Sequence, residues 1–404
     1  MPLASNSSLK TGARPETELL LLCARTRMNP ETTAGVESLL QGNIDWDYLL
    51  EMAQENGVIP LLYWNLNSTC PEAVPKATLD HLQDRFRKNT QKAVFMAGEL
   101  IRLLNLFEER GISAVPYKGP FLAASLYGNL ALRRRSVDLD ILIPEKDVLK
   151  AKDLLLSQGY HPEDKWTRQQ EKVLLRASCE YTFVHYGKRI KVELHWKITP
   201  NYFSFPLDPE RLWERLIPSS LADKEVLSFS PEHLLLILCV HGANHLWQQL
   251  EFICGVAELI RVNESLNWGE LMKEARELGS ERMLFLGLFL ANDLLGAPLP
   301  GPVLQRVRAD SSVKALAAQV CERLFREASS PPPGVLETSL FHLRTRERLQ
   351  DRVLYCIRLV MSPTEYDWAA LPLPEALSFF YYILRPIRLL TGKYGLLGLL
   401  RRFL

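Results

Sequence analysis

The chain has 404 residues, a formal net charge of +1 and 47% hydrophobic residues. This balance excludes the basic excess of a dedicated nucleic-acid-binding protein and the polarity of an intrinsically disordered chain. The length suffices for two or three domains with a sizeable apolar core, so we expect a soluble globular protein.

The seven cysteines are odd in number, scattered, and contain no C-x-x-C pair. We therefore expect reduced thiols in a cytoplasmic protein rather than a disulfide framework or a cysteine zinc site. The N-terminus lacks a charged segment followed by an apolar one, so secretion is not expected, and residues 1–15 are predicted to be disordered.

Residues 16–110 have helical periodicity throughout, and this range is predicted to form an N-terminal helical region. Pro60 ends one helix, because proline removes a helical hydrogen bond and restricts the preceding residue. A long helix is expected from about Ala77 to Arg110, where Gly111 provides the usual C-terminal stop.

The periodicity changes after Gly111 and predicts a mixed core over residues 111–230. Tyr186-Gly187-Lys188 is expected to be the turn of an antiparallel hairpin. The expected strands are 112–117, 139–143, 181–185 and 189–196, and the expected helices are 121–127 and 146–158. These elements predict a small mixed β-sheet with helices on one side.

From Pro231 onward the pattern is helical again, so residues 231–404 are predicted to form a C-terminal helical region. The fold class we expect is α+β, with a small mixed sheet flanked by helical regions. The C-terminal tail is apolar, but Arg385, Pro386 and Arg388 interrupt it before it reaches the length of a membrane span. We favour a tail helix docked on the fold with its basic groups extended to solvent; peripheral contact with a membrane is the less favoured alternative.

Two carboxylates, Asp138 and Asp140, enter the apolar run that forms the second predicted strand. Side chains at i and i+2 of a strand point to the same face, so the two carboxylates are directed at one point in space. Mg²⁺ prefers oxygen ligands and completes its shell with substrate phosphates, which indicates phosphoryl or nucleotidyl transfer. The alternative is a strand edge with two solvated acids.

Glu193 lies in a later strand of the same predicted sheet and is the candidate third acid. Together with Asp138 and Asp140 it would hold two Mg²⁺ ions. Alternatively, Glu193 pairs with Lys191 or Lys197 on an exposed strand face.

Lys118, Gly119 and Arg133 are candidate ligands for a triphosphate. A glycine after the first strand lets backbone N–H groups approach phosphate oxygens, while lysine and arginine supply positive charge. The alternative for the run Arg133-Arg134-Arg135 is a solvated basic loop.

Three histidines are further candidates for the site. His241 and His245 lie one helical turn apart, and we expect them either to pack in an apolar helix or to face the sheet across a cleft; no third ligand for zinc is evident. His195 lies on the same strand face as Glu193, so it either lines the site or is a core imidazole bonded to backbone.

A strand ending in Lys-Gly, an R-x-x-x-x-D-x-D strand and a later strand with Glu193, His195 and Trp196 occur in this order. The series resembles the DNA polymerase β type nucleotidyltransferase superfamily, and most closely its uncharacterised bacterial nucleotidyltransferase family. Segments around Trp46, His241–His245 and Asp367-Trp368 extend the likeness over most of residues 40–390.

The resemblance implies a two-metal reaction in which an acceptor hydroxyl attacks the α-phosphate of an NTP and displaces pyrophosphate. It assigns Asp138, Asp140 and Glu193 as catalytic metal ligands for Mg²⁺. The chain departs from the superfamily at Lys118-Gly119, where a Gly-Gly or Gly-Ser turn is usual. It also departs from its own family at Gly255, where an Asp is expected.

Several alternatives remain open at this level. The nucleotide base is undetermined, and the acceptor is a small molecule, a saccharide, an RNA end or a protein hydroxyl. Phosphoryl transfer is a variant within the enzyme class. A non-catalytic binding or scaffold protein with the same fold is the alternative from another class.

Overall fold

The computed structural model describes residues 14–134, 138–164, 166–326, 333–363, 367, 371, 373 and 375–391. The disorder expected for residues 1–13, the interpretation of Arg135 and the tail beyond residue 391 lie outside these ranges. Helix α1 begins at Pro15.

In the described part of the chain before the sheet there are five α-helices, within the range where the periodicity predicted a helical region. Pro15, Pro30 and Pro60 stand in the first turns of three of them, where the missing N–H is not needed. Pro60 therefore begins a helix rather than ending the preceding one, which stops at Glu55. Asn29 and Asp45 cap two of them by accepting hydrogen bonds from backbone N–H groups. The helices are α1 (Pro15–Cys23), α2 (Pro30–Leu40), α3 (Trp46–Glu55), α4 (Ile59–Thr69) and α5 (Lys76–Glu109).

The central sheet has five strands in the order β1-β2-β5-β4-β3. Strands β2 and β5 are parallel, and the other three neighbouring pairs are antiparallel, so the sheet is mixed as expected. The strands are β1 (Val115–Pro116), β2 (Asp138–Leu142), β3 (His161–Pro162), β4 (Glu180–His185) and β5 (Ile190–His195).

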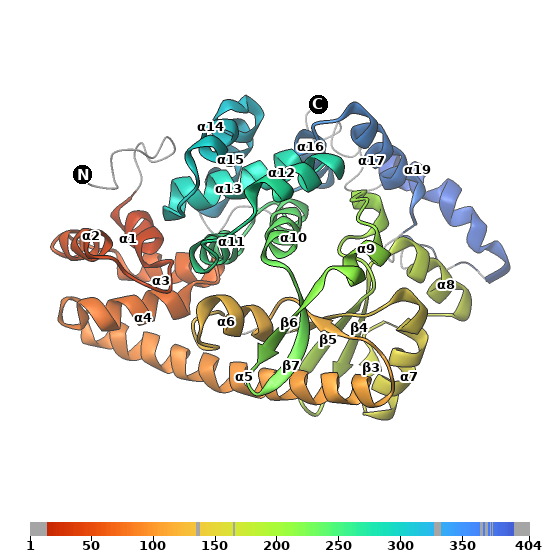
Figure 1. Cartoon of the computed structure of the whole chain (residues 1–404), viewed down its shortest axis with the longest axis horizontal. Helices are drawn as coiled ribbons and strands as arrows, with labels where there is room; N and C mark the ends of the chain where they lie inside the picture. The colour runs from red at the N-terminus through yellow and green to blue at the C-terminus, as the bar shows by residue number, and fades with distance from the viewer. Residues whose placement is uncertain are drawn as a thin grey trace.

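One face of this sheet is covered by α5 and by α7 (Val148–Ser157), which run beneath it in Figure 1. Leu139 and Ile141 of β2 and Leu194 of β5 pack with Leu103 of α5 and Leu155 of α7 in one buried cluster. Because strand side chains alternate, the neighbouring residues of β2 and β5 point to the opposite face.

Several elements were not predicted from the sequence. Strand β1 contains two paired residues where the expected strand spanned 112–117. The periodicity also gave no indication of β3, α8 (Arg168–Ala177), α9 (Pro209–Glu214) or the hairpin of β6 (Leu216–Leu221) and β7 (Lys224–Phe229). Strand β3 is too short for a periodic pattern to show, and β6 contains Pro218, which disfavours a strand assignment.

The C-terminal helices form a layer opposite the free face of the sheet, above it in Figure 1. Their residues share one continuous apolar core with the N-terminal helices, which includes Leu19, Leu62, Leu235, Ile253 and Leu288. The first helices of this layer are α10 (Pro231–Asn244), α11 (Leu250–Val262), α12 (Trp268–Glu277), α13 (Glu281–Leu295), α14 (Gly301–Ala309) and α15 (Ser311–Leu324).

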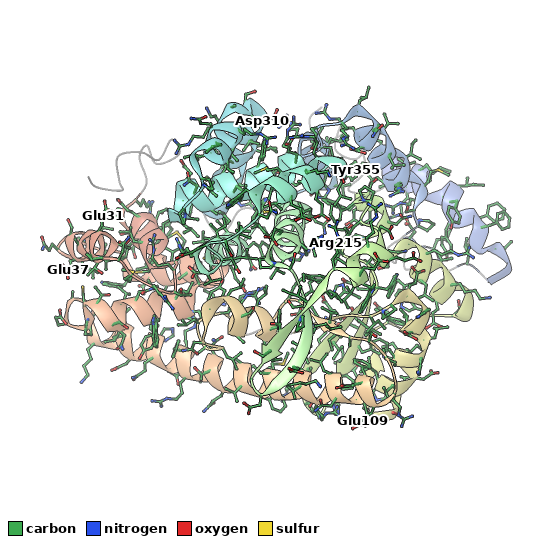
Figure 2. The ribbon with its side chains drawn as sticks, in the orientation of Figure 1. Glu31, Glu37, Glu109, Arg215, Asp310 and Tyr355 are labelled. Atoms are coloured by element: carbon green, nitrogen blue, oxygen red, sulfur yellow. The ribbon has the colours of Figure 1, made fainter. Side chains whose placement is uncertain are left out.

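The last described helices are α16 (Val335–Arg344), α17 (Leu349–Met361) and α19 (Tyr381–Thr391). Tyr355 of α17, labelled in Figure 2, is buried, and its hydroxyl lies 3.1 Å from Nδ1 of His342 on α16. Arg385 of α19 is also buried and donates to Asp367 at 2.8 Å instead of extending to solvent. Among the described helices, none has the length and apolarity required to cross a membrane.

Candidate active site

The pairing of β2 with β5 aligns the predicted acids. Asp140 is the register partner of Glu193, and Leu142 is the partner of His195. Asp138 and Asp140 share a face of β2 by their spacing, and partners in parallel strands point to the same side. The three acids and His195 therefore lie on the sheet face that α5 and α7 do not cover.

Asp140 is the most buried of these acids and has two cationic or potentially cationic neighbours. Its Oδ1 accepts a hydrogen bond from Lys118 Nζ at 2.8 Å and lies 3.3 Å from His195 Nε2. Burial raises a carboxyl pKa, but the Lys118 charge and the neighbouring His195 outweigh it and hold the pKa of Asp140 well below its usual range. The pKa of Lys118 is raised, since Asp140 outweighs the burial of the ammonium group.

Asp138 has a different environment. Burial and the charges of Asp140 and Glu193 raise its pKa to about 6, although Lys118 partly opposes them. Besides burial, the repulsion among three carboxylates directed at one region therefore disfavours the charged form of Asp138. This repulsion would be relieved by a bound cation.

The donor atoms fit a metal ion. Oxygens of Asp140 and Glu193 and a ring nitrogen of His195 all lie within 4.8 Å of one another. Carboxylate oxygens are the protein ligands that Mg²⁺ prefers, and Asp138 adds a further carboxylate on the same face. These three ligand atoms could hold a metal ion, and they include two of the three acids singled out in the sequence, Asp140 and Glu193.

Gly119 positions the loop beside this set. Its φ of +56° and ψ of −130° lie in a region that favours glycine, and helix α6 (Pro120–Tyr127) begins immediately afterwards. The Gly119 carbonyl accepts a hydrogen bond from Arg133 Nη1 at 3.4 Å.

Glu251, which the sequence analysis did not single out, holds the basic loop. Arg133 Nη2 lies 2.9 Å from Glu251 Oε1, and the guanidinium of Arg134 contacts the other carboxylate oxygen. The side chain of Arg133 is 13% exposed and that of Arg134 is 47% exposed, and both pair with Glu251, so neither is the freely solvated side chain of the alternative interpretation. A lone acid at the start of a predicted helix gave no signal of this pairing.

His241 on α10 and His245, which directly follows this helix, form the wall opposite the sheet. Their ring centroids are 4.4 Å apart, and both rings lie against Phe252 of α11. Burial, followed by the nearby Lys118 charge, lowers the pKa of His241 well below its ordinary value and that of His245 to about 4. Both imidazoles are therefore neutral at pH 7, and within the described ranges they join no three-ligand metal group.

A strained turn after α10 shapes the chain next to these two histidines. Leu246 and Trp247 have φ values of +55° and +53°, which are uncommon for residues other than glycine. They fold the Trp247 indole back onto Gly242, where an added Cβ would lie 2.6 Å from the ring. The glycine between the two histidines is thus required by packing.

A cavity of about 770 Å³ connects these surfaces. It is lined by every predicted site residue: Asp138, Asp140, Glu193, Lys118, Gly119, Arg133, His195, His241 and His245. The lining residues that sequence reasoning missed include Cys179, Glu180, Tyr202, Asn244, Gln248 and Glu251. Gly255 is not among the lining residues, and an added Cβ there would meet only Leu238, at 4.0 Å.

Comparisons with known proteins give a family for the chain. No curated protein and no solved structure matches it. A family model described as "Uncharacterised nucleotidyltransferase" matches residues 42–296, which include the whole sheet and helices α10, α11 and α13. The chain therefore belongs to this uncharacterised nucleotidyltransferase family.

Proposed function

We propose that the protein is a Mg²⁺-dependent nucleotidyltransferase that moves an NMP from an NTP to a hydroxyl group of an acceptor. The observation that carries the proposal is the register pairing of Asp140 with Glu193, which joins the two sequence-distant parts of the acid set on one face. Membership of the family supports nucleotidyl transfer as the reaction class.

The acids Asp138, Asp140 and Glu193 would hold two Mg²⁺ ions. When bound, these ions neutralise phosphate charge and lower the pKa of the attacking hydroxyl. Asp140 would bind the metal and at the same time pair with Lys118, whose ammonium group lies 2.8 Å away. Lys118 is thereby kept protonated and positioned at the acid set, where the phosphates of an NTP would bind.

The reaction requires only the NTP and the acceptor hydroxyl. The acceptor oxygen forms a bond to the α-phosphorus, the bond from the α-phosphorus to the oxygen bridging to the β-phosphate breaks, and pyrophosphate leaves. Glu193 is the carboxylate we assign to take the hydroxyl proton. Its side chain is 20% exposed against 5% for Asp140, so it is the more accessible of the two to an entering acceptor.

The neutral wall of His241, His245 and Phe252 has a different role. Uncharged rings do not attract the negative charge of a phosphate. They provide apolar surface and hydrogen-bonding nitrogens for a base or ribose. We therefore place the nucleoside against α10 and α11, and the triphosphate toward Lys118 and Arg133.

The test is incubation of the purified protein with Mg²⁺, a cell extract and each NTP labelled in turn at the α- or γ-phosphate. Label from the α-position on an extract component, lost in Asp140→Asn and Glu193→Gln, is the expected result. Transfer of the γ-label would instead assign phosphoryl transfer. Binding of NTP without transfer of either label would assign a non-catalytic binding protein.

A further inference from the structure

A second donor set, formed by Cys179, Glu180 and His195, lies beside the acid set. The thiol, a carboxylate oxygen and a ring nitrogen of these residues lie within 4.8 Å of one another. The distances are 3.3 Å from His195 Nδ1 to Glu180 Oε2 and 3.7 Å from Cys179 Sγ to the same oxygen. This is a mixed nitrogen, sulfur and oxygen set, unlike the carboxylates of Asp138, Asp140 and Glu193.

These separations suit a tetrahedral ion. Zinc binds sulfur at about 2.3 Å and nitrogen or oxygen at about 2.0 Å, so tetrahedral ligands lie roughly 3.3 to 3.6 Å apart. The two measured separations are close to this range without movement of the backbone.

His195 supplies the independent observation. Its side chain is 2% exposed, and within the described part of the chain neither ring nitrogen has a partner in hydrogen-bonding geometry, while carboxylate oxygens lie 3.3 to 3.5 Å away. A buried imidazole with two unbonded nitrogens loses the interactions it makes with water. Nδ1 lies near Glu180, and Nε2 lies near Asp140 and Glu193.

The backbone holds the three residues rigidly. Glu180 and His195 are direct partners in the antiparallel pair of β4 and β5, so their side chains share a face. The Cys179 carbonyl accepts a hydrogen bond from the Trp196 N–H at 2.9 Å, which ties the residue before β4 to the end of β5.

We propose that Cys179, Glu180 and His195 bind a zinc ion, with the fourth coordination position open to the cavity. Cys179 and His195 are buried, whereas the Glu180 side chain is 37% exposed, so the open position lies on the Glu180 side. Binding releases the thiol proton to solvent and forms a zinc thiolate.

The two ring nitrogens of His195 then have different partners. Mg²⁺ prefers oxygen, whereas zinc accepts nitrogen and sulfur, so zinc takes Nδ1. The Nε2–H is then directed at Asp140, 3.3 Å away, an arrangement in which a carboxylate orients a metal-bound histidine. This zinc site does not depend on the proposed transfer reaction.

Cobalt is the probe for the test, because Co²⁺ replaces zinc and a thiolate ligand gives it a charge-transfer band in the near ultraviolet. The full-length protein is stripped with a chelator, titrated with Co²⁺ and then with Zn²⁺, and its metal content is measured after dialysis. We expect about one equivalent of Co²⁺ with the thiolate band, displaced by Zn²⁺ but not by excess Mg²⁺.

The test variant is Cys179→Ser. The control is Cys356→Ser, because Cys356 is an exposed thiol remote in sequence. Cys179→Ser is expected to lose the band and at least 10-fold in zinc affinity, and Cys356→Ser to keep both. The absence of a thiolate band in the wild type overturns the proposal without reference to any variant. An equal band in Cys179→Ser also overturns it.

Discussion

Asp140 and Glu193 are 53 residues apart in sequence and are direct register partners in parallel strands β2 and β5. A shift of one residue in this register would turn Glu193 to the face covered by α5 and α7. The apolar residues Leu139, Ile141, Val192 and Leu194 fix the register, because all four are fully buried on that other face. The same alternation that builds the core therefore builds the acid set.

Replacing Lys118 with Met is expected to lower kcat/KM for the labelled NTP on the order of 100-fold, since it removes a buried donor aimed at the site. Lys118→Arg keeps the charge and is expected to retain more activity than Lys118→Met. Initial-rate kinetics with the acceptor that the labelling experiment reveals give the measurement, and thermal melting checks the fold. Equal kcat/KM for Lys118→Met and wild type would show that this ammonium group plays no part.

Gly242→Ala is expected to destabilise the protein by about 1 to 3 kcal/mol, because the added methyl group overlaps the Trp247 ring. Gly255→Ala is the matched control in the neighbouring helix α11. Its Cβ meets only Leu238 at 4.0 Å, so helix propensity should leave it neutral or up to about 1 kcal/mol more stable. Urea unfolding gives the midpoint of each variant. Equal midpoints for Gly242→Ala and Gly255→Ala would refute the packing role of Gly242.

Glu99 on α5 predicts a pH dependence of stability away from the active site. Its carboxylate accepts hydrogen bonds from Arg102, Lys188 and Tyr160 at 2.7 to 2.8 Å. Burial raises the pKa of Glu99, but these three donors outweigh it and lower the pKa from 4.5 to about 2. A depressed carboxyl pKa stabilises the fold above the unfolded pKa, and this contribution is lost as pH falls from 4.5 toward 2.

Glu99→Gln should therefore be less stable than the wild type by about 1 to 2 kcal/mol at pH 7, because solvent screens part of the ion pairing, with the difference at least halved at pH 3. The control is Glu109→Gln, an exposed position at the end of the same helix that Figure 2 labels. Denaturant unfolding at several pH values provides the data. A difference that stays constant with pH would mean that the Glu99 charge contributes nothing.

Replacing Asp367 with Asn is expected to loosen α19, because Arg385 is buried and would keep its charge with a weaker partner. Removing one member of a buried ion pair costs about 3 to 5 kcal/mol, here confined to the elements that the pair joins. Hydrogen exchange should rise in α17 and α19 and stay unchanged in α5. Unchanged exchange in α19 would contradict this role for the pair.

Much of the fold followed from periodicity, but parts of it did not. The long helix was predicted at 77–110 and spans Lys76–Glu109, because its apolar stripe and Gly111 define it locally. Strand β3 and the hairpin β6–β7 depend on pairing partners and carry weak local patterns. The shared face of Asp138 and Asp140 could be predicted because spacing on a strand determines the face of a side chain.

The remaining wall of the cavity could not be predicted in the same way. Glu251 meets Arg133 only because α11 packs near the loop before β2, and the sequence separation of these residues carries no information on that contact. The position of Cys179 in the sequence gives no indication that His195 lies near it, because strand pairing brings Glu180 and His195 together. The neutral state of His241 and His245 depends on burial that a helical pattern alone does not specify.

The most direct test of the central claim is nucleotide-dependent binding of Mn²⁺, used in place of Mg²⁺ and followed by the signal of free Mn²⁺ in electron paramagnetic resonance. The protein is titrated with and without a non-hydrolysable NTP analogue. Wild type and Glu145→Gln, an exposed acid outside the cavity, should bind additional Mn²⁺ when the analogue is present. Asp140→Asn and Glu193→Gln, shown to be folded by melting, should lose that nucleotide-dependent fraction; its full retention in both variants would contradict the assignment of these carboxylates as the metal site.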